Sequence, residues 1–329
     1  MTTPIFILSL PRSGSTLLQR LLLSSNECAS LGETSLLLRF LGDSNSVTRF
    51  ANYRESNLEL SFRDLRDHYP DFPKKYDEMV HSSMLSLYTF LAEDKKYFID
   101  KTPRYTLIAE EIKRTFPNAK IIVLWRHPLA IASSISKTFF KGKWRFDDFL
   151  VDFYVGWDRL YSFSQKHADS ICSIRYEDLL TTPDLELKKL EKFIGFPESS
   201  LSAEAELPTL IGRLGDPKRE SENSKVDSSR GQAWQEDFSN WYRQKWARQF
   251  YTSARSAHLD ELGYDAPKFI ETTLIPHGLI DGIKEYRYHK KKVSKELRLT
   301  QEIFQREYIS PYGISPELLE SDEALEWDS

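Results

Sequence analysis

The chain has 329 residues, 40% of them hydrophobic, so it is long enough for one large domain with insertions or for two domains. Its 45 Lys and Arg against 49 Asp and Glu give a formal charge of −4, which argues against a general nucleic-acid binder. The two cysteines, Cys28 and Cys172, are far apart without a CxxC motif, which favours a reducing compartment with both thiols buried.

Short apolar strand candidates alternate with helical stretches along the chain. The predicted strands are Ile5–Leu8, Tyr97–Ile99, Lys120–Trp125 and Ser170–Tyr176, and the predicted helices are Ser15–Ser24, Arg104–Thr115, Leu129–Lys137 and Leu185–Phe193. The run KIIVLW at Lys120–Trp125 is apolar almost throughout, as expected of a strand buried on both faces of a parallel sheet. The alternation predicts an α/β fold with a P-loop-like open parallel sheet flanked by helices.

The remaining segments predict the domain organisation. A charged and aromatic stretch at about 36–94 is expected to be a helical insertion, and the polar stretch Gly212–Gly231 a long loop. Residues 1–280 are predicted to form a single domain. Residues 281–329 begin with a basic helical pattern and end in an acidic tail, which predicts a C-terminal helical extension that packs on the domain or faces a lipid or a partner.

The sequence also bears on location. The apolar run Ile5–Leu10 lacks a basic segment before it and is cut short by Arg12, so it does not resemble a signal peptide. No stretch approaches the roughly 18 apolar residues of a membrane span. We therefore expect a cytoplasmic protein without a transmembrane segment.

The stretch FILSLPRSGSTLLQRLLLSS passes from the first predicted strand through a tight turn into the first predicted helix. Such a turn presents backbone N–H groups and the positive end of a helix dipole to an anion. Gly14 permits close approach of the backbone, and Arg12 offers a planar fork for phosphate oxygens. Hydroxyl donors come from Ser13, Ser15 and Thr16. The pattern predicts a loop that binds a polyanion.

This loop departs from the Walker A pattern, because Ser9 stands where the first Gly is expected and Ser15 stands where the Lys is expected. Kinases and NTPases use that Lys and Mg²⁺ to neutralise a γ-phosphate. A transferred sulfuryl group carries less charge, so hydroxyls, amides and one or two cations can suffice without a metal. The alternatives are a Mg-dependent P-loop kinase and a turn with incidental Ser and Arg.

A second segment, FPNAKIIVLWRHPLAIASSISKTFF, places Arg126 directly after a buried strand and Ser134 about two helical turns later. Ligand-contacting residues gather at the carboxyl ends of parallel strands, so both side chains can meet the ligand of the first loop. Two neighbouring anion sites suggest a nucleotide with phosphates at two positions. Alternatively, Arg126 pairs with a surface carboxylate. His127 is expected to cap or pack rather than to act as a base.

PRSGSTLL followed by FPNAKIIVLWRHPLAIASSIS resembles the paired signatures of the PAPS-dependent sulfotransferases, above all the bacterial branch and the tyrosylprotein sulfotransferases. These enzymes take a sulfuryl group from 3′-phosphoadenosine 5′-phosphosulfate (PAPS) and release PAP. The resemblance implies that Arg12–Thr16 holds the 5′-phosphosulfate and that Arg126 and Ser134 bind the 3′-phosphate. It implies a sulfotransferase that needs no metal.

The resemblance implies further roles. Glu33 in SLGETSLL corresponds to a proposed general base, and Lys101 in FIDKTPR, together with Arg12, would hold charge on the departing oxygen. Relatives carry an Asp after this Lys, whereas here Asp100 precedes it. Tyr176 in IRYEDLL matches a nucleotide contact. The alternatives are a helix-capping Glu, an ordinary Asp100–Lys101 ion pair and a packing aromatic.

The resemblance also suggests how the nucleotide is covered and what the acceptor is. A basic loop late in the chain closes over the nucleotide in relatives, and here Arg230, then Lys225, is favoured for that contact, with a solvated charge run as the alternative. The acceptor is expected to be a carbohydrate or small-molecule hydroxyl rather than a peptide tyrosine, because the chain looks intracellular. Tyrosylprotein-type sulfation, a non-catalytic nucleotide-binding protein and a homodimer are left open, and no nucleic-acid partner is expected.

Overall fold

The computed structural model describes residues 2–41, 62, 64–145, 149–210, 234–252, 256–267 and 278–288. The chain divides into two compact units. The first comprises Met1–Arg126 and Asp152–Gly231, and the second comprises His127–Val151 and Gln232–Ser329. The domain limits predicted from the sequence stay a prediction.

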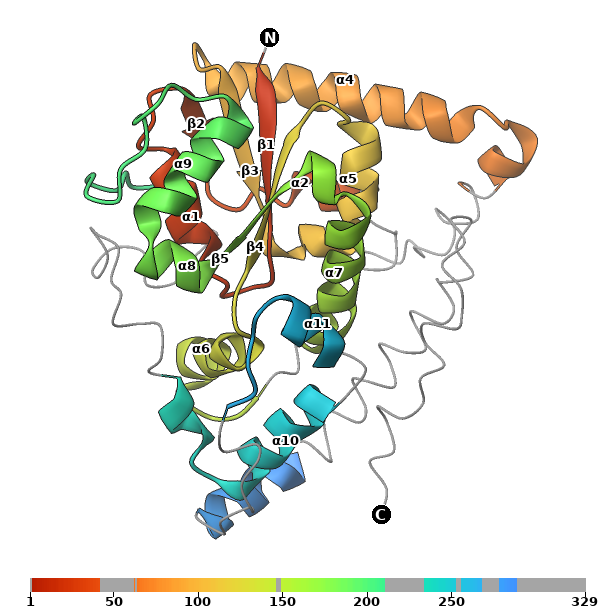
Figure 1. The fold of residues 1–329 in the computed structure, drawn as a ribbon. Coiled ribbons are helices and arrows are strands. Elements are labelled where there is room, and N and C mark those ends of the chain that lie inside the picture. Colours follow the sequence, from red (N-terminus) through yellow and green to blue (C-terminus); the bar gives the residue numbers. More distant parts are fainter. Residues whose placement is uncertain are drawn as a thin grey trace. The chain divides into compact units, whose positions relative to one another are not determined.

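A five-stranded parallel sheet forms the centre of the first unit (Figure 1). Its strands are β1 (Thr3–Leu8), β2 (Cys28–Ser30), β3 (Tyr97–Lys101), β4 (Lys120–Trp125) and β5 (Cys172–Arg175), in the spatial order β2-β3-β1-β4-β5. Because all neighbours are parallel, the carboxyl ends of the strands lie along one edge of the sheet. The predicted open parallel α/β sheet is confirmed.

Burial explains why these segments form strands. Every residue of β3 is buried, and β4 is buried from Ile121 to Trp125, as the predicted two-sided burial requires. The strand predicted at Tyr97–Ile99 continues to Lys101, so it carries two charged residues into the sheet. The short edge strand β2 was not predicted.

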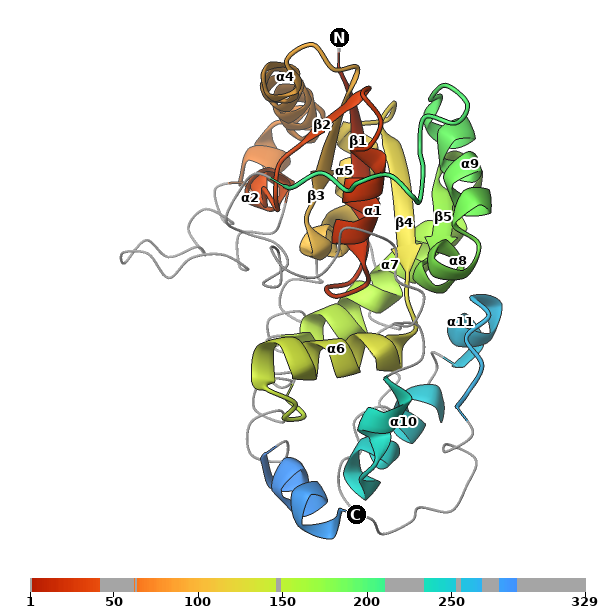
Figure 2. The ribbon, with the colours of Figure 1, turned by 90° about the vertical axis from the view of Figure 1, so that its left-hand side faces the viewer.

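Helices cover both faces of the sheet. One face carries α1 (Ser15–Leu22), α8 (Tyr176–Thr181) and α9 (Pro183–Ile194), and the other carries α4 (Phe72–Ala92), α5 (Ala109–Thr115) and α7 (Trp157–Lys166), as Figures 1 and 2 show. Within the stretch expected to be a helical insertion, the described residues form α2 (Leu36–Leu41) and α4.

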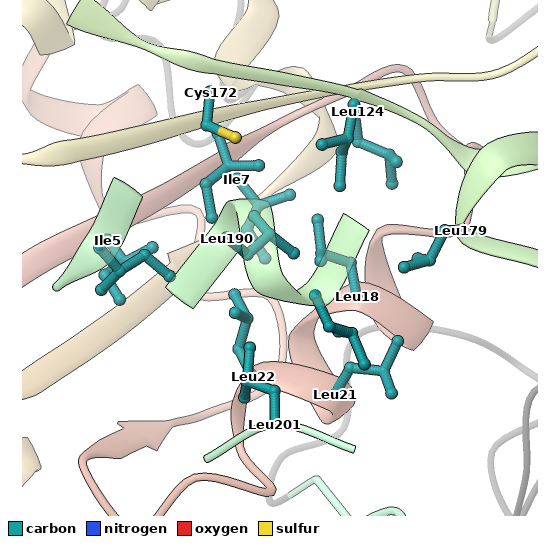
Figure 3. Packing of buried hydrophobic residues seen from close by; sticks show 14 of the residues in the cluster. Ile5, Ile7, Leu18, Leu21, Leu22, Leu124, Cys172, Leu179, Leu190 and Leu201 are labelled. Carbon is teal, nitrogen blue, oxygen red and sulfur yellow. The ribbon is translucent and has the colours of Figure 1, made fainter. Parts of the chain in front are cut away.

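Alternate strand residues supply the two cores. Ile5 and Ile7 of β1 point into the cluster under α1, α8 and α9, where Leu18 and Leu190 also pack (Figure 3). Phe6 points the other way, toward the ring of Tyr88 in α4. The cluster on the α1 face also buries both cysteines, as predicted. Burial raises the pKa of the Cys28 thiol to about 12 and that of Cys172 to about 11.

The second unit is helical. It contains α6 (Pro128–Phe140), α10 (Trp241–Thr252), α11 (Ser256–Glu261) and a helix at residues 279–288. Arg243 of α10 pairs with Glu285 of the helix at 279–288 at 2.6 Å. A Cβ on Gly282 would lie 2.2 Å from the Trp241 indole nitrogen, so this helix approaches α10 at a position that has no side chain. No helix in the described parts of the chain is long and apolar enough to cross a bilayer.

Candidate active site

The loop between β1 and α1 has an unusual backbone conformation, which lets Tyr176 pack directly on it. Arg12 has φ 67° and Gly14, the residue before α1, has φ 91°, both in the left-handed region. This conformation costs a non-glycine residue about 1–2 kcal/mol, so Arg12 must be held in it. A Cβ on Gly14 would lie 2.3 Å from the Tyr176 ring, so glycine is required there both for its backbone and for its lack of a side chain.

Arg126 holds this loop from the end of β4. Its Nη1 donates a hydrogen bond to the Arg12 carbonyl at 2.8 Å. Its guanidinium carbon also lies 4.5 Å from the centre of the Tyr176 ring, in a cation–π contact. Arg126 and Tyr176, directly after β4 and β5, therefore stack against Gly14 at the start of α1. The sequence predicted a common ligand for Arg12 and Arg126, and the structure brings these two residues into direct contact.

Lys101 joins the loop to Glu33. Its ammonium lies 2.9 Å from Glu33 Oε1 and donates a longer hydrogen bond, 3.4 Å, to Thr16 Oγ1 in the first turn of α1. The Lys101 side chain is 1% exposed, whereas that of Glu33 is 25% exposed and opens to solvent. An ammonium with so little water around it needs such partners. The arrangement places a carboxylate beside the loop between β1 and α1.

Asp100 does not pair with Lys101 in the way that the alternative interpretation supposed. Its carboxylate is fully buried on the other face of β3, where it accepts hydrogen bonds from Thr34, Tyr88 and Tyr105. Burial raises the pKa of Asp100 above its usual value, although the three hydroxyls and Lys101 act to lower it. Sequence reasoning missed this cluster. Its signal was an acidic residue in the middle of an apolar strand, which must find polar partners.

The loop residues fit a sulfuryl or phosphate group. The Ser13 hydroxyl is buried and has no hydrogen-bond partner among the described residues. A buried hydroxyl without a partner costs free energy, which an oxygen-rich ligand would recover. Ser15 and Thr16 begin α1, whose free backbone N–H groups and dipole favour an anion.

The second unit holds Ser134 and His127. Ser134 lies half-buried in α6, next to Ser133, whose hydroxyl bonds Asp237. That Ser134 meets the same ligand as Arg126 stays a prediction. His127 precedes α6 and accepts a hydrogen bond from the Leu129 N–H through Nδ1, so the predicted capping role is confirmed.

Two predicted residues, Lys225 and Arg230, lie outside the described residues. No group of three or more His, Cys, Asp or Glu side chains that could hold a metal ion occurs in the described part of the chain. Metal independence stays a prediction.

Comparisons with known proteins fit this geometry. A model of the sulfotransferase family matches residues 4–200, more than half of the chain. The chain is 30% identical over 135 residues to nodulation protein NoeE of Sinorhizobium fredii, which covers 40% of this chain and 31% of that protein. It is 24% identical over 216 residues to protein-tyrosine sulfotransferase 1 of Danio rerio, a match that covers 64% of this chain and 58% of that protein. These matches therefore span less than two thirds of either relative.

A solved structure shares the fold. The sulfotransferase domain from the curacin biosynthetic pathway superimposes with a TM-score of 0.55 and 20% identity. The match covers 81% of this chain and 99% of that domain. At this identity the likeness concerns the fold alone.

Proposed function

The chain belongs to the sulfotransferase family, and from that premise we propose that it moves a sulfuryl group from PAPS to the hydroxyl of an acceptor. The observation that supports this most is the position of Lys101, between Thr16 of the anion-binding loop and the Glu33 carboxylate. A transferable anion held by the loop and a base that activates the attacking hydroxyl must lie close together, and Lys101 bridges the two.

In the proposed reaction each side chain has one task. PAPS, when bound, supplies a sulfuryl group on a phosphate leaving group. Glu33 accepts the proton of the acceptor hydroxyl as that oxygen bonds to sulfur. The bond between sulfur and the phosphate oxygen breaks, and Lys101, Arg12 and the N–H groups at the start of α1 stabilise the charge that stays on the phosphate. The products are the sulfated acceptor and PAP.

The choice of donor depends on a second anion site. We propose that Arg126 and Ser134 bind the 3′-phosphate, with Tyr176 contributing to the nucleotide contact and Lys225 or Arg230 closing over it. Arg126 is suited to this role because a guanidinium fixed on an aromatic ring keeps a defined orientation. The Lys of a Walker A loop is replaced by Ser15, which disfavours a kinase.

For the acceptor we favour a carbohydrate or small-molecule hydroxyl, with a protein tyrosine as the alternative. The zebrafish relative is named for tyrosine sulfation, which keeps that alternative in the test.

Calorimetric binding of PAP, AMP and ATP, first with EDTA and then with Mg²⁺, tests the donor. We expect PAP to bind in the micromolar range, independently of metal and well ahead of AMP. Metal-dependent ATP binding without a preference for the 3′-phosphate would overturn the proposal. Transfer from ³⁵S-labelled PAPS to an oligosaccharide mixture, a set of phenols and an acidic tyrosine peptide then separates the acceptor classes.

A further inference from the structure

Glu33 belongs to a segment that no helix or strand holds in place. Residues 31–35 follow β2, which ends at Ser30, and precede α2, which begins at Leu36. A side chain on such a segment can serve as a base only if contacts from elsewhere fix its position to within a fraction of an ångström. The structure contains two such sets of contacts, one on each side of Glu33.

Before Glu33 the segment is tied to α1. Gln19 of α1 is fully buried, and its amide donates to Ser30 Oγ at 2.6 Å and to the Leu31 carbonyl at 2.7 Å. The Ser30 hydroxyl in turn donates to the Ile99 carbonyl of β3 at 2.7 Å. These bonds fix the chain two residues ahead of Glu33.

After Glu33 the segment is tied to β3. The Thr34 hydroxyl donates to Asp100 Oδ1 at 2.8 Å, and the Ser35 N–H donates to Thr102 Oγ1 at 3.0 Å. Asp100 Oδ2 accepts from Tyr88 at 2.6 Å and from Tyr105 at 3.0 Å. Three hydroxyls therefore satisfy a carboxylate that has no contact with water.

The two faces of β3 explain the geometry. Successive strand residues point to opposite faces, so Lys101 points toward α1 and Asp100 toward α4, which lies across the sheet from α1 (Figure 2). Glu33 bonds Lys101 on one face while Thr34 bonds Asp100 on the other. The dipeptide 33–34 thus straddles the end of β3, and the Thr34–Asp100 bond limits where the Glu33 side chain can go.

We propose that Asp100 is a positioning residue, which through Thr34 holds the Glu33 carboxylate against Lys101. The catalytic meaning of this inference rests on the proposed function, but the positioning itself does not. It predicts that the Glu33–Lys101 pair is strong only while the Thr34–Asp100 bond is present.

A double-mutant cycle tests this. Urea unfolding of Glu33→Gln, Lys101→Met and the double variant gives the interaction free energy between Glu33 and Lys101. The cycle is measured in the wild-type background and again in Thr34→Val and Tyr88→Phe backgrounds. The two background changes are matched, because each removes one hydroxyl donor to Asp100 and only Thr34→Val releases the Glu33 segment. We expect a coupling factor of roughly 3 to 30 in the unfolding equilibrium constant for wild type and Tyr88→Phe.

In the Thr34→Val background we expect the Glu33–Lys101 coupling factor to fall to about one. In a Thr34→Ser background, which keeps the hydroxyl, we expect the coupling factor to return to its wild-type range. Coupling that persists in Thr34→Val, or that is lost equally in Tyr88→Phe, would overturn the proposal. PAP binding measured on the same proteins separates the two hypotheses, since a wild-type chain that shows the coupling but binds no PAP refutes the proposed function alone.

Discussion

The Lys101 ammonium contacts the Glu33 carboxylate at 2.9 Å, although the two residues are 68 positions apart in the chain. Lys101 is almost fully buried at the end of β3, and the same nitrogen reaches Thr16 at the start of α1. This one side chain therefore connects the proposed base with the proposed donor loop, so changes on either side of it should have separable effects.

Replacing Glu33 by Gln should lower turnover by roughly 10²- to 10⁴-fold, because the amide cannot accept the acceptor's proton. Gln keeps an oxygen for Lys101, so PAP affinity should change little. Initial rates of transfer from labelled PAPS and calorimetry with PAP measure the two effects. Glu78→Gln, on the exposed face of α4, serves as the control. A variant that retains wild-type turnover would show that the base lies elsewhere.

Replacing Arg126 by Ala should weaken PAP binding by about 2–3 kcal/mol, or roughly 30- to 150-fold. The change removes a charged partner of the ligand and also releases the Arg12 carbonyl. Arg126→Lys should recover only part of the affinity, since an ammonium cannot both donate as a fork and lie flat on Tyr176. The exposed Arg114→Ala is the control. Unchanged PAP affinity together with weaker AMP binding would contradict a 3′-phosphate role.

Replacing Gly14 by Ala should displace the Tyr176 ring and lower PAP affinity, measured by calorimetry, by more than about tenfold. The new Cβ would clash with the ring, and an alanine at this positive φ would also strain the backbone. Gly195→Ala is a matched control. Gly195 also has φ 91°, but the nearest atom to its Cβ is the Tyr97 hydroxyl at 3.7 Å. Equal losses of stability in the two variants would mean that backbone strain alone, and not the Tyr176 contact, makes Gly14 necessary.

Asp152 gives the chain a pH-dependent stability. It is buried at the start of a π-helical turn, 3.5 Å from Arg104, and burial raises its pKa to about 6. The folded pKa exceeds the unfolded one, so this group's contribution to stability is complete below about pH 4 and is lost as the pH rises through 6. Asp152→Asn should therefore be more stable than wild type by about 3 kcal/mol above pH 7.

Urea unfolding at pH 4 and pH 7.5 checks this expectation for Asp152→Asn. The advantage of the variant should shrink to well under about 1 kcal/mol at the lower pH, where the folded carboxyl is protonated and the unfolded one is about half protonated. The exposed Asp169→Asn serves as the control. An Asp152→Asn difference that is the same at both values would rule out titration of Asp152 as its cause.

Much of the fold could be predicted because the central strands β1, β3 and β4 are buried on both faces. β4 was predicted with its limits, and β1, β3 and β5 to within a few residues, since apolar β-branched runs have few alternatives in an open sheet. β2 could not be predicted, because three residues, Cys28–Ser30, carry no periodicity, and only pairing with β3 makes them a strand.

The site was predicted in part. A local pattern marks the loop at Arg12–Thr16, and the position of Arg126 after a buried strand indicates where its side chain lies. The partner of Asp100 could not be found in this way. Its neighbour in the chain is Lys101, but the pleat of the strand sends the two side chains to opposite faces, and the hydroxyl of Thr34 comes from a distant segment.

The sheet order has a consequence for how the chain matures. β1 is the middle strand, yet the carbonyl of Arg12 is held by a side chain 114 positions later, and Gly14 rests on the still later Tyr176. A nascent chain that contains only the β1–α1 loop has the loop's sequence but lacks Arg126 and Tyr176, the side chains that hold its conformation. The proposed nucleotide affinity would therefore arise only once β4 and β5 have been made, and a ligand that binds only completed chains stabilises those alone by mass action.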